Sequence, residues 1–235
     1  MLAAAVLTRI DGEPRFMIAE MTADTNGSTN AGISGSGLLA RIRTRLALAP
    51  DPASLGGDHA VAGLPRPERV LTPAAVLVPI VLRADGPSVL LTQRTEHLLN
   101  HPGQISFPGG RSEAEDAGPV DTALREAEEE IGLARRHVEV VGFLDLYQTV
   151  TGFLVTPVVA FVEPGFALSL DAFEVAEAFE VPLAFVLDAG NHTRGSRLVD
   201  GRERQFYVLP YQDRYIWGAT AAMLVNLAHK LAPGD

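Results

Sequence analysis

The segment PVDTALREAEEEIG, residues 119–132, constrains the fold of this chain more than any other, because it carries start and stop signals of a helix. Pro119 suits the first helical position, where no backbone N–H is needed, and Asp121 complements the positive end of the helix dipole. Gly132 is a natural stop, since glycine adopts the left-handed conformation that ends many helices. The sequence therefore predicts one amphipathic helix here.

The predicted helix has one apolar stripe and one acidic cluster. At about 100° per residue, four apolar side chains share a stripe that we expect to be buried: Val120, Leu124, Ala127 and Ile131. Glu126, Glu129 and Glu130 are related by three and four positions and cluster away from that stripe. Their mutual repulsion disfavours the helix, whereas a hard divalent cation such as Mg²⁺ would reverse the sign. Spacing alone leaves a solvated helix face as the alternative.

The remainder of the chain alternates strand-like and helix-like segments. Runs rich in Val, Leu, Ile and aromatic residues predict strands over residues 74–83, 88–94, 138–148, 153–163 and 204–211. Apolar residues at helical spacing predict two further helices, over residues 38–48 and 217–231. This interleaving predicts an α/β fold in which helices cover the faces of a mixed sheet.

Composition and charge exclude several classes of site and partner. The chain has no Cys, which removes disulfides and thiolate chemistry, and its net charge of −10 opposes general affinity for nucleic acid or anionic membranes. The first residues lack a basic region typical of secretory signals, and the apolar runs are too short to span a bilayer. We expect a cytoplasmic protein. Residues 22–38, rich in Gly, Ser, Thr and Asn, predict a flexible linker.

The acidic helix and the glycines before it resemble a known signature. Gly110, Asp116 and the run REAEEEIGL, residues 125–133, resemble the Nudix box of hydrolases that cleave nucleoside diphosphate derivatives. The box, about residues 110–133, has one additional residue in its first half, with Asp where Glu is common. The segment LLTQRTEHLLNHPGQISFPGG, residues 90–110, is similar to the motif of the coenzyme A pyrophosphatase branch, except that Leu99 stands where that branch usually has Arg.

The resemblance implies a fold and a domain division. The fold would be the Nudix α/β/α sandwich, with a mixed β-sheet between helices. The Nudix hydrolase domain would span residues 37–235, and residues 1–36 would form a flexible N-terminal extension outside the resemblance.

The resemblance also implies a chemistry. Mg²⁺ or Mn²⁺ would be held by Glu126 and Glu130, with Glu129 as a further ligand or as the base that polarises water. Arg125 would orient Asp116 and nearby backbone. The substrate would contact Gly109 and Gly110, which permit close backbone approach, and Arg94, for which a structural salt bridge is the alternative. Coenzyme A or a derivative would be cut to 4′-phosphopantetheine and adenosine 3′,5′-bisphosphate.

Other interpretations stay open at the level of sequence. The box recognises the diphosphate and not the rest of the substrate, so ADP-ribose, NADH or another dinucleotide is an alternative substrate. A second alternative is that the chain is a non-catalytic nucleotide-binding regulator. The oligomeric state is open, a homodimer included. Several further side chains are candidates whose simpler interpretation is a solvated surface: Glu174 and Glu177 in a predicted loop, His97 and His101, and Arg197, Arg202 and Arg204 near a predicted hairpin.

Overall fold

The structure is a computed structural model that describes residues 7–10, 13–16, 35–199 and 201–232. The chain divides into two units, one ending at Ser34 and one beginning at Gly35. The described part of the first unit is an antiparallel hairpin of β1 (Leu7–Ile10) and β2 (Glu13–Phe16). The rest of the predicted extension, with most of the predicted linker, lies outside the described residues, so the domain boundary at residue 37 stays a prediction.

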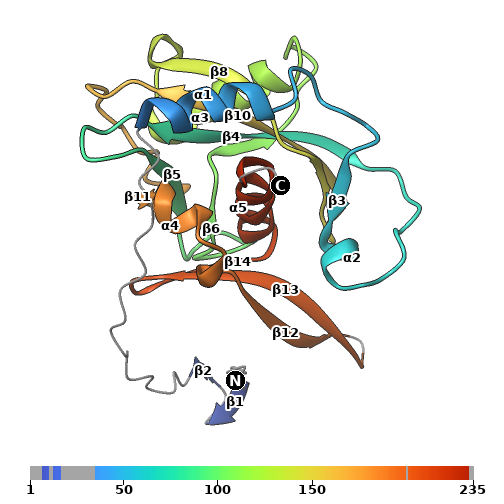
Figure 1. Cartoon of the computed structure of the whole chain (residues 1–235). Helices are drawn as coiled ribbons and strands as arrows, with labels where there is room; N and C mark the ends of the chain where they lie inside the picture. The colour runs from blue at the N-terminus through green and yellow to red at the C-terminus, as the bar shows by residue number, and fades with distance from the viewer. Residues whose placement is uncertain (1–6, 11–12, 17–34, 200, 233–235) are drawn as a thin grey trace. The chain divides into compact units, whose positions relative to one another are not determined.

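The second unit is built on one mixed sheet of nine strands. Its main path runs β11-β5-β4-β10-β9-β3, while β6 pairs with β5, β7 with β4 and β8 with β10 (Figure 1). The strands are β3 (Leu55–Gly57), β4 (Thr72–Val81), β5 (Ser88–Arg94), β6 (Ile105–Ser106), β7 (Gly109–Arg111), β8 (Val138–Phe143), β9 (Leu146–Gln148), β10 (Phe153–Val162) and β11 (Val175–Pro182).

The centre of the sheet is the parallel pair of β4 and β10, which are in register over ten residues from Thr72 opposite Phe153. Both strands are buried over most of their length, which explains why their sequences are nearly continuous apolar runs rather than alternating ones. Side chains of β4 alternate between two cores: Ala75 and Leu77 belong to one, and Val78 and Ile80 to the other.

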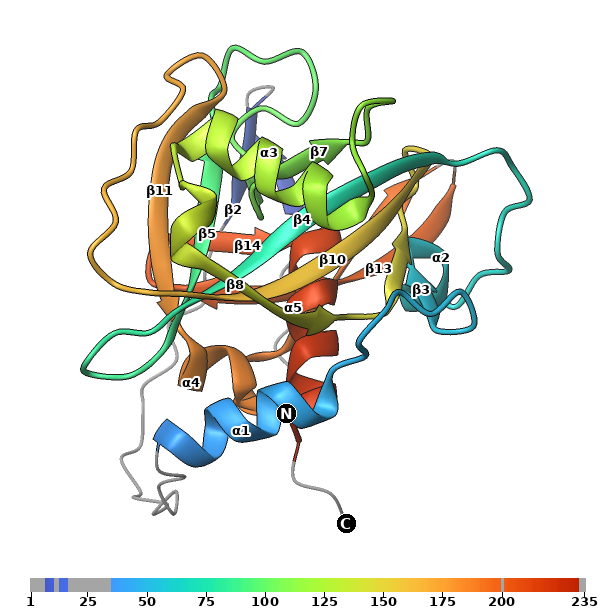
Figure 2. The same cartoon turned by 90° about the horizontal axis from the view of Figure 1, so that it is seen from above.

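Helices cover both faces of this sheet. The first core is closed by α3 (Pro119–Ile131), which lies above β4 and β10 in Figure 1, and the second by α5 (Gly218–Leu231) below them. Ile42 and Leu46, in α1 (Gly35–Arg45) and directly after it, join the same core as α5. Figure 2 shows α3 crossing the strands near β7. The predicted α/β sandwich with a mixed sheet is confirmed.

A second, smaller sheet packs against α5. It is antiparallel and has the order β12-β13-β14, formed by β12 (Thr193–Val199), β13 (Arg202–Tyr211) and β14 (Arg214–Trp217). The remaining short elements are α2 (Asp58–Val61), α4 (Leu183–Leu187), η1 (Arg135–His137) and η2 (Ala189–Asn191). Among the described residues, no helix has both the length and the apolar character that crossing a bilayer requires.

Three sequence predictions about elements need correction. The linker predicted over residues 22–38 ends earlier, because α1 begins at Gly35. The strand predicted over residues 138–148 is two strands, β8 and β9, separated by Leu144 and Asp145. The segment around Glu177 is not a loop but β11, which pairs with β5 and becomes an edge of the main sheet. This strand mixes charged and apolar residues, as strands at the edge of a sheet often do, so it lacks the apolar run by which the other strands were predicted.

Candidate functional site

Helix α3 begins and ends as its sequence predicts. Pro119 stands at the start, and Gly132 ends the helix in the left-handed conformation with φ of 68°. The backbone N–H groups at and after Gly132 donate to the carbonyls of Ala127 and Glu128, which closes the last turn. The acidic cluster therefore sits on a helix with a defined end, and its side chains have fixed directions.

The buried face of α3 differs from the predicted stripe. Ala123, Ala127 and Ile131 are fully buried, but Val120 and Leu124 are only half-buried. Glu130, which the helical wheel placed away from the apolar side, is also buried, with 7% of its surface exposed. The reason is that β7 packs against α3 on that side, so the helix is covered over a wider arc than its apolar residues alone indicate.

Burial changes the chemistry of Glu130. Its carboxylate accepts a hydrogen bond from the backbone N–H of Gly109 at 3.1 Å and lies 3.8 Å from the guanidinium of Arg94. Burial, together with the negative charges of Glu126 and Glu174, nevertheless raises the pKa of Glu130 to about 7. Burial and the charge of Glu129 also raise the pKa of Glu126. The two carboxylates lie in a place where negative charge is under-compensated.

The two glycines explain how these carboxylates fit. Gly109 has φ of 151°, and a side chain there would place Cβ 2.5 Å from the carbonyl oxygen of Ala75. A Cβ at Gly110 would lie 2.5 Å from the carboxyl carbon of Glu126. Both glycines lie in strand β7 and not in a simple turn. Because Gly110 has no side chain, the Glu126 carboxylate can occupy the space beside it.

Arg125 is the centre of a charged network. Its Nε and Nη2 each donate to the carboxylate of Asp116 at 2.9 Å, and Nη2 also donates to the backbone carbonyl of Arg111. The guanidinium lowers the pKa of Asp116, which also accepts from the Thr122 hydroxyl. The implied contact between Arg125 and Asp116 is present, and it ties the loop before α3 to the helix.

The same guanidinium also contacts the acidic cluster. Nη1 of Arg125 donates to Glu126 at 2.9 Å and to Glu129 at 3.0 Å. Glu129 is largely exposed, unlike Glu126 and Glu130, so the three carboxylates have three different environments. Across the described residues, no three acidic or histidine side chains converge closely enough to hold a metal as they stand. Glu129 would have to leave Arg125 to join the other two.

Two side chains from outside the helix complete this region. Arg94, at the end of β5, lies between two carboxylates, 3.8 Å from Glu130 and 3.7 Å from Glu174. Glu174 directly precedes β11, and its charge raises the pKa of both Glu126 and Glu130. Glu177, the other candidate, instead forms an ion pair with Arg214. The structure thus brings Glu174 into the site and leaves Glu177 outside it.

A cleft of about 930 Å³ lies beside this region, but none of the four carboxylates Glu126, Glu129, Glu130 and Glu174 lines it. Its walls include Arg94, Gly109 and Gly110, and also His101. They include two arginines that the sequence indicated as solvated, Arg197 and Arg204, and three apolar or aromatic side chains that sequence reasoning missed: Phe206, Trp217 and Met223. No local spacing could have indicated these, because β6, β7, β12–β14 and α5 meet only in the folded chain.

Two candidates are absent from the described cleft wall. Leu99 is fully exposed, and His97 instead packs edge-on against Phe173 at 4.8 Å between ring centroids. The departure at Leu99 is therefore at an exposed side chain outside the described cleft wall, next to Asn100 and His101, which line it.

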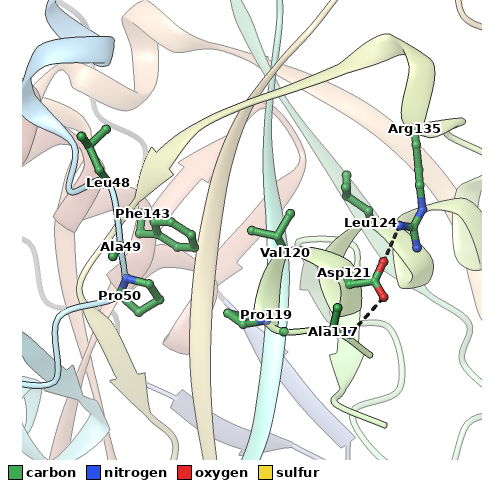
Figure 3. Close-up of a pocket in the computed structure, with 11 residues that line it drawn as sticks. Leu48, Ala49, Pro50, Ala117, Pro119, Val120, Asp121, Leu124, Arg135 and Phe143 are labelled. Carbon is green, nitrogen blue, oxygen red and sulfur yellow. Dashed lines mark hydrogen bonds and ion pairs between the residues drawn. The ribbon is translucent and has the colours of Figure 1, made fainter. Parts of the chain in front are cut away.

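A second pocket, of about 540 Å³, lies at the start of α3. Figure 3 shows Val120 and Leu124 facing Phe143 across it, with Leu48 and Pro50 on the far side. At its rim Asp121 forms an ion pair with Arg135 and accepts the backbone N–H of Ala117. None of the predicted site residues lines this pocket. The pocket explains why Val120 and Leu124 are only half-buried.

Comparison with known proteins agrees with the geometry. Residues 71–187 match the family model described as the NUDIX domain. Proteins named uncharacterized Nudix hydrolase NudL, from Salmonella paratyphi B and Salmonella enteritidis, are each 41% identical over 155 residues, which cover 66% of this chain and 80% of theirs. Among solved structures, an Ap4A hydrolase from C. elegans aligns with a TM-score of 0.42 and 19% identity over 47% of this chain and 80% of its own.

Proposed function

The chain belongs to the Nudix hydrolase family, and from this premise we propose that its substrate is coenzyme A or a derivative of coenzyme A. As a Nudix hydrolase it cleaves a nucleoside diphosphate derivative at its diphosphate. On coenzyme A, the oxygen of water would form a new bond to one phosphorus while the bridging P–O bond breaks. The products would be 4′-phosphopantetheine and adenosine 3′,5′-bisphosphate.

One observation carries the proposal of coenzyme A. The segment that resembles the coenzyme A pyrophosphatase branch, residues 90–110, lies along the wall of the 930 Å³ cleft through Arg94, residues 104–107 and the two glycines. A cleft of this size is at the upper end of the range for small-molecule sites, roughly 300–1,000 Å³, and suits an extended substrate. This position supports a role for the motif in substrate binding beyond its role in the fold.

The donor set fits a divalent cation. Glu126 and Glu130 offer oxygen donors, and both have a raised pKa because burial and neighbouring carboxylates oppose their charge. Gly110 leaves the space in front of Glu126 free of a side chain. Hard cations such as Mg²⁺ and Mn²⁺ prefer such oxygen donors. We assign Glu126 and Glu130 as their ligands, with Glu129 joining after release from Arg125. The bound cation supplies charge neutralisation at the diphosphate and activation of water.

The other residues have supporting roles in this proposal. Arg125 holds the loop at Asp116 and orients Glu126 through hydrogen bonds, and its hydrogen bond to Glu129 would be replaced when Glu129 joins the cation. Arg94 would bind a phosphate oxygen; in support, its ion pairs at 3.7–3.8 Å are too long for strong hydrogen bonds. Glu174 lies near the acidic cluster but belongs to the segment before β11 and not to α3. It is our candidate for the general base.

The experiment is product analysis by mass spectrometry with coenzyme A, ADP-ribose and NADH, each with Mg²⁺ or Mn²⁺ and with chelator. We expect metal-dependent formation of 4′-phosphopantetheine from coenzyme A, with Glu126→Gln inactive. Glu128→Gln is the matched control, because Glu128 lies on the same helix but faces Arg135. Much faster hydrolysis of ADP-ribose or NADH would overturn the coenzyme A assignment. Absence of metal-dependent turnover with every substrate would favour a nucleotide-binding regulator.

A further inference from the structure

The hairpin of β12 and β13 places two arginines opposite each other. Arg197 and Arg204 are direct partners in the antiparallel ladder, so their side chains share one face. Both line the cleft. Like charges directly opposite each other in a sheet repel. Because both arginines line the cleft, the pair offers hydrogen-bond donors to an anionic group of a ligand.

An aromatic surface lies beside these arginines on the same face. Phe206 stands opposite Gly195, where an added Cβ would be 2.7 Å from its ring, so the glycine makes room for the ring. The ring packs edge-on against Trp217, with 5.3 Å between centroids, and both rings line the cleft. The guanidinium of Arg197 lies 5.8 Å from the centroid of Trp217. Aromatic rings exposed in a cleft are suited to stacking on a nucleobase.

The cleft is positively charged although the chain is acidic. Among the described residues that line it, one is acidic, Asp58, and five are arginines: Arg69, Arg94, Arg111, Arg197 and Arg204. The whole chain has a net charge of −10. Arginine binds phosphate through two parallel N–H groups, which makes this cleft suited to a ligand with more than one phosphate group.

We propose that Arg197 and Arg204, with Phe206 and Trp217, bind the nucleoside part of the substrate and select a phosphate monoester on its ribose. We assign the diphosphate to the region of Gly109 and Gly110 and the additional phosphate to the arginine pair; both regions line the same cleft. This inference rests on the proposed function and defines its substrate class as nucleoside diphosphate derivatives with an additional ribose phosphate.

The direct test uses Trp217, which is the one tryptophan of the chain, as a fluorescent reporter. Adenosine 3′,5′-bisphosphate and adenosine 5′-monophosphate are titrated without metal, so neither hydrolysis nor the carboxylates contribute. We expect quenching by both, with Kd about tenfold or more lower for the bisphosphate, because charge-assisted hydrogen bonds to the extra phosphate are added. Arg197→Ala, and Arg197→Gln as a second variant, should remove that difference.

Arg194→Ala is the matched control. Arg194 is on the same strand, but its hydrogen bonds go to Gln205 and Tyr207, and it is not part of the described cleft wall. The control should keep the preference for the bisphosphate. Equal Kd values in the unmodified protein, no change in Trp217 emission, or an equal loss in Arg194→Ala would each overturn the inference.

A kinetic test separates this inference from the proposed function. Coenzyme A is compared with 3′-dephospho-coenzyme A, and NADPH with NADH; each pair differs by one ribose phosphate. We expect a lower KM for the phosphorylated member. Arg197→Ala should remove this difference in KM, whereas the control Arg194→Ala should keep it. If coenzyme A is inert but NADPH is preferred over NADH, the coenzyme A assignment fails and the hairpin assignment stands. If both coenzyme A forms react equally well, the hairpin assignment fails and the assigned hydrolysis stands.

Discussion

The end of α3 and the face of the β12–β13 hairpin are opposite in charge. At α3, Glu126 and Glu130 are buried carboxylates whose pKa values are raised. On the hairpin, Arg197 and Arg204 form a pair of cations beside two aromatic rings. Each region holds like charges close together, which suits the binding of a ligand of opposite charge.

The difference between them lies in how the charges are brought together. The carboxylates are three and four residues apart on one helix, so local geometry alone aligns them. The arginines are brought together by the register of two strands, in which Val199 pairs with Arg202 and Arg197 with Arg204. We assign to the first region the metal binding that hydrolysis of every substrate requires. We assign to the second region the discrimination among substrates. The predictions below test that separation.

The largest effect is expected at α3. Glu126→Gln and Glu130→Gln should each lower kcat/KM by about 100-fold or more for every substrate, because a metal ligand is lost. Both variants should still bind adenosine 3′,5′-bisphosphate at Trp217 with unchanged Kd. Near-normal hydrolysis in either variant would contradict the metal assignment, and a matching loss of bisphosphate binding would show that the two regions are not separable.

The two adjacent glycines should respond differently to alanine. Gly109→Ala puts Cβ against backbone atoms of β4 and requires an unfavourable φ, so it should lower the free energy of unfolding by about 2 kcal/mol or more. Gly110→Ala meets the carboxylate of Glu126, which is a side chain that can move. It should lower activity more than stability. Chemical denaturation and kcat/KM of both variants check this; equal stability losses would contradict the assigned role of Gly110.

Substitution of Arg94 should lower kcat/KM less than loss of a carboxylate ligand on α3. Arg94→Ala should lower kcat/KM by a few tens of fold, about 2 kcal/mol, if its guanidinium binds a phosphate of the substrate. Arg94→Lys should restore only part of this, because lysine lacks the planar fork. The loss should be the same for coenzyme A and its 3′-dephospho form. A loss confined to one of the pair would place Arg94 with the hairpin arginines instead.

The raised pKa of Glu130 predicts an unusual pH dependence of stability. Between its ordinary value of 4.5 and about 7, the folded chain binds a proton that the unfolded chain has lost, so stability falls as pH rises through this window. In chelator, Glu130→Gln should therefore be more stable than the unmodified protein at pH 8, by on the order of 2–3 kcal/mol, and similar at pH 5. Glutamine can still accept the Gly109 hydrogen bond. Denaturant titrations at both pH values check this; equal differences would contradict it.

Sequence predicts one of these regions far better than the other. The bounds of α3 and the stop at Gly132 follow from local sequence signals, and the contact of Arg125 with Asp116 is implied by the family resemblance. The burial of Glu130 does not, because β7 covers that side of the helix only after long-range pairing with β4. The location of Glu174 could not be predicted either, because nothing in the sequence indicates that the start of β11 lies beside Arg94.

The hairpin shows the same limit more strongly. Its existence was predictable, but not the pairing of Arg197 with Arg204, since a shift of one residue would have placed them on opposite faces. Trp217 joins them through β14, and the cleft also needs α5 and β6. Charges without local periodicity predict a solvated surface, and the sequence alone could not show that Arg197 and Arg204 line a cleft.

Leu99 should have the smallest effect. The resemblance to the coenzyme A branch makes its replacement of an arginine conspicuous, yet its side chain is fully exposed and does not line the described cleft. An arginine there would be solvated and would gain little from a phosphate that it does not face, since exposed charge pairs contribute roughly 0–1 kcal/mol. We therefore expect Leu99→Arg to change kcat/KM for coenzyme A by less than about fivefold, with no change in the ratio to 3′-dephospho-coenzyme A. A larger gain confined to the phosphorylated member would assign ribose-phosphate selection to the 95–104 loop and remove it from the hairpin.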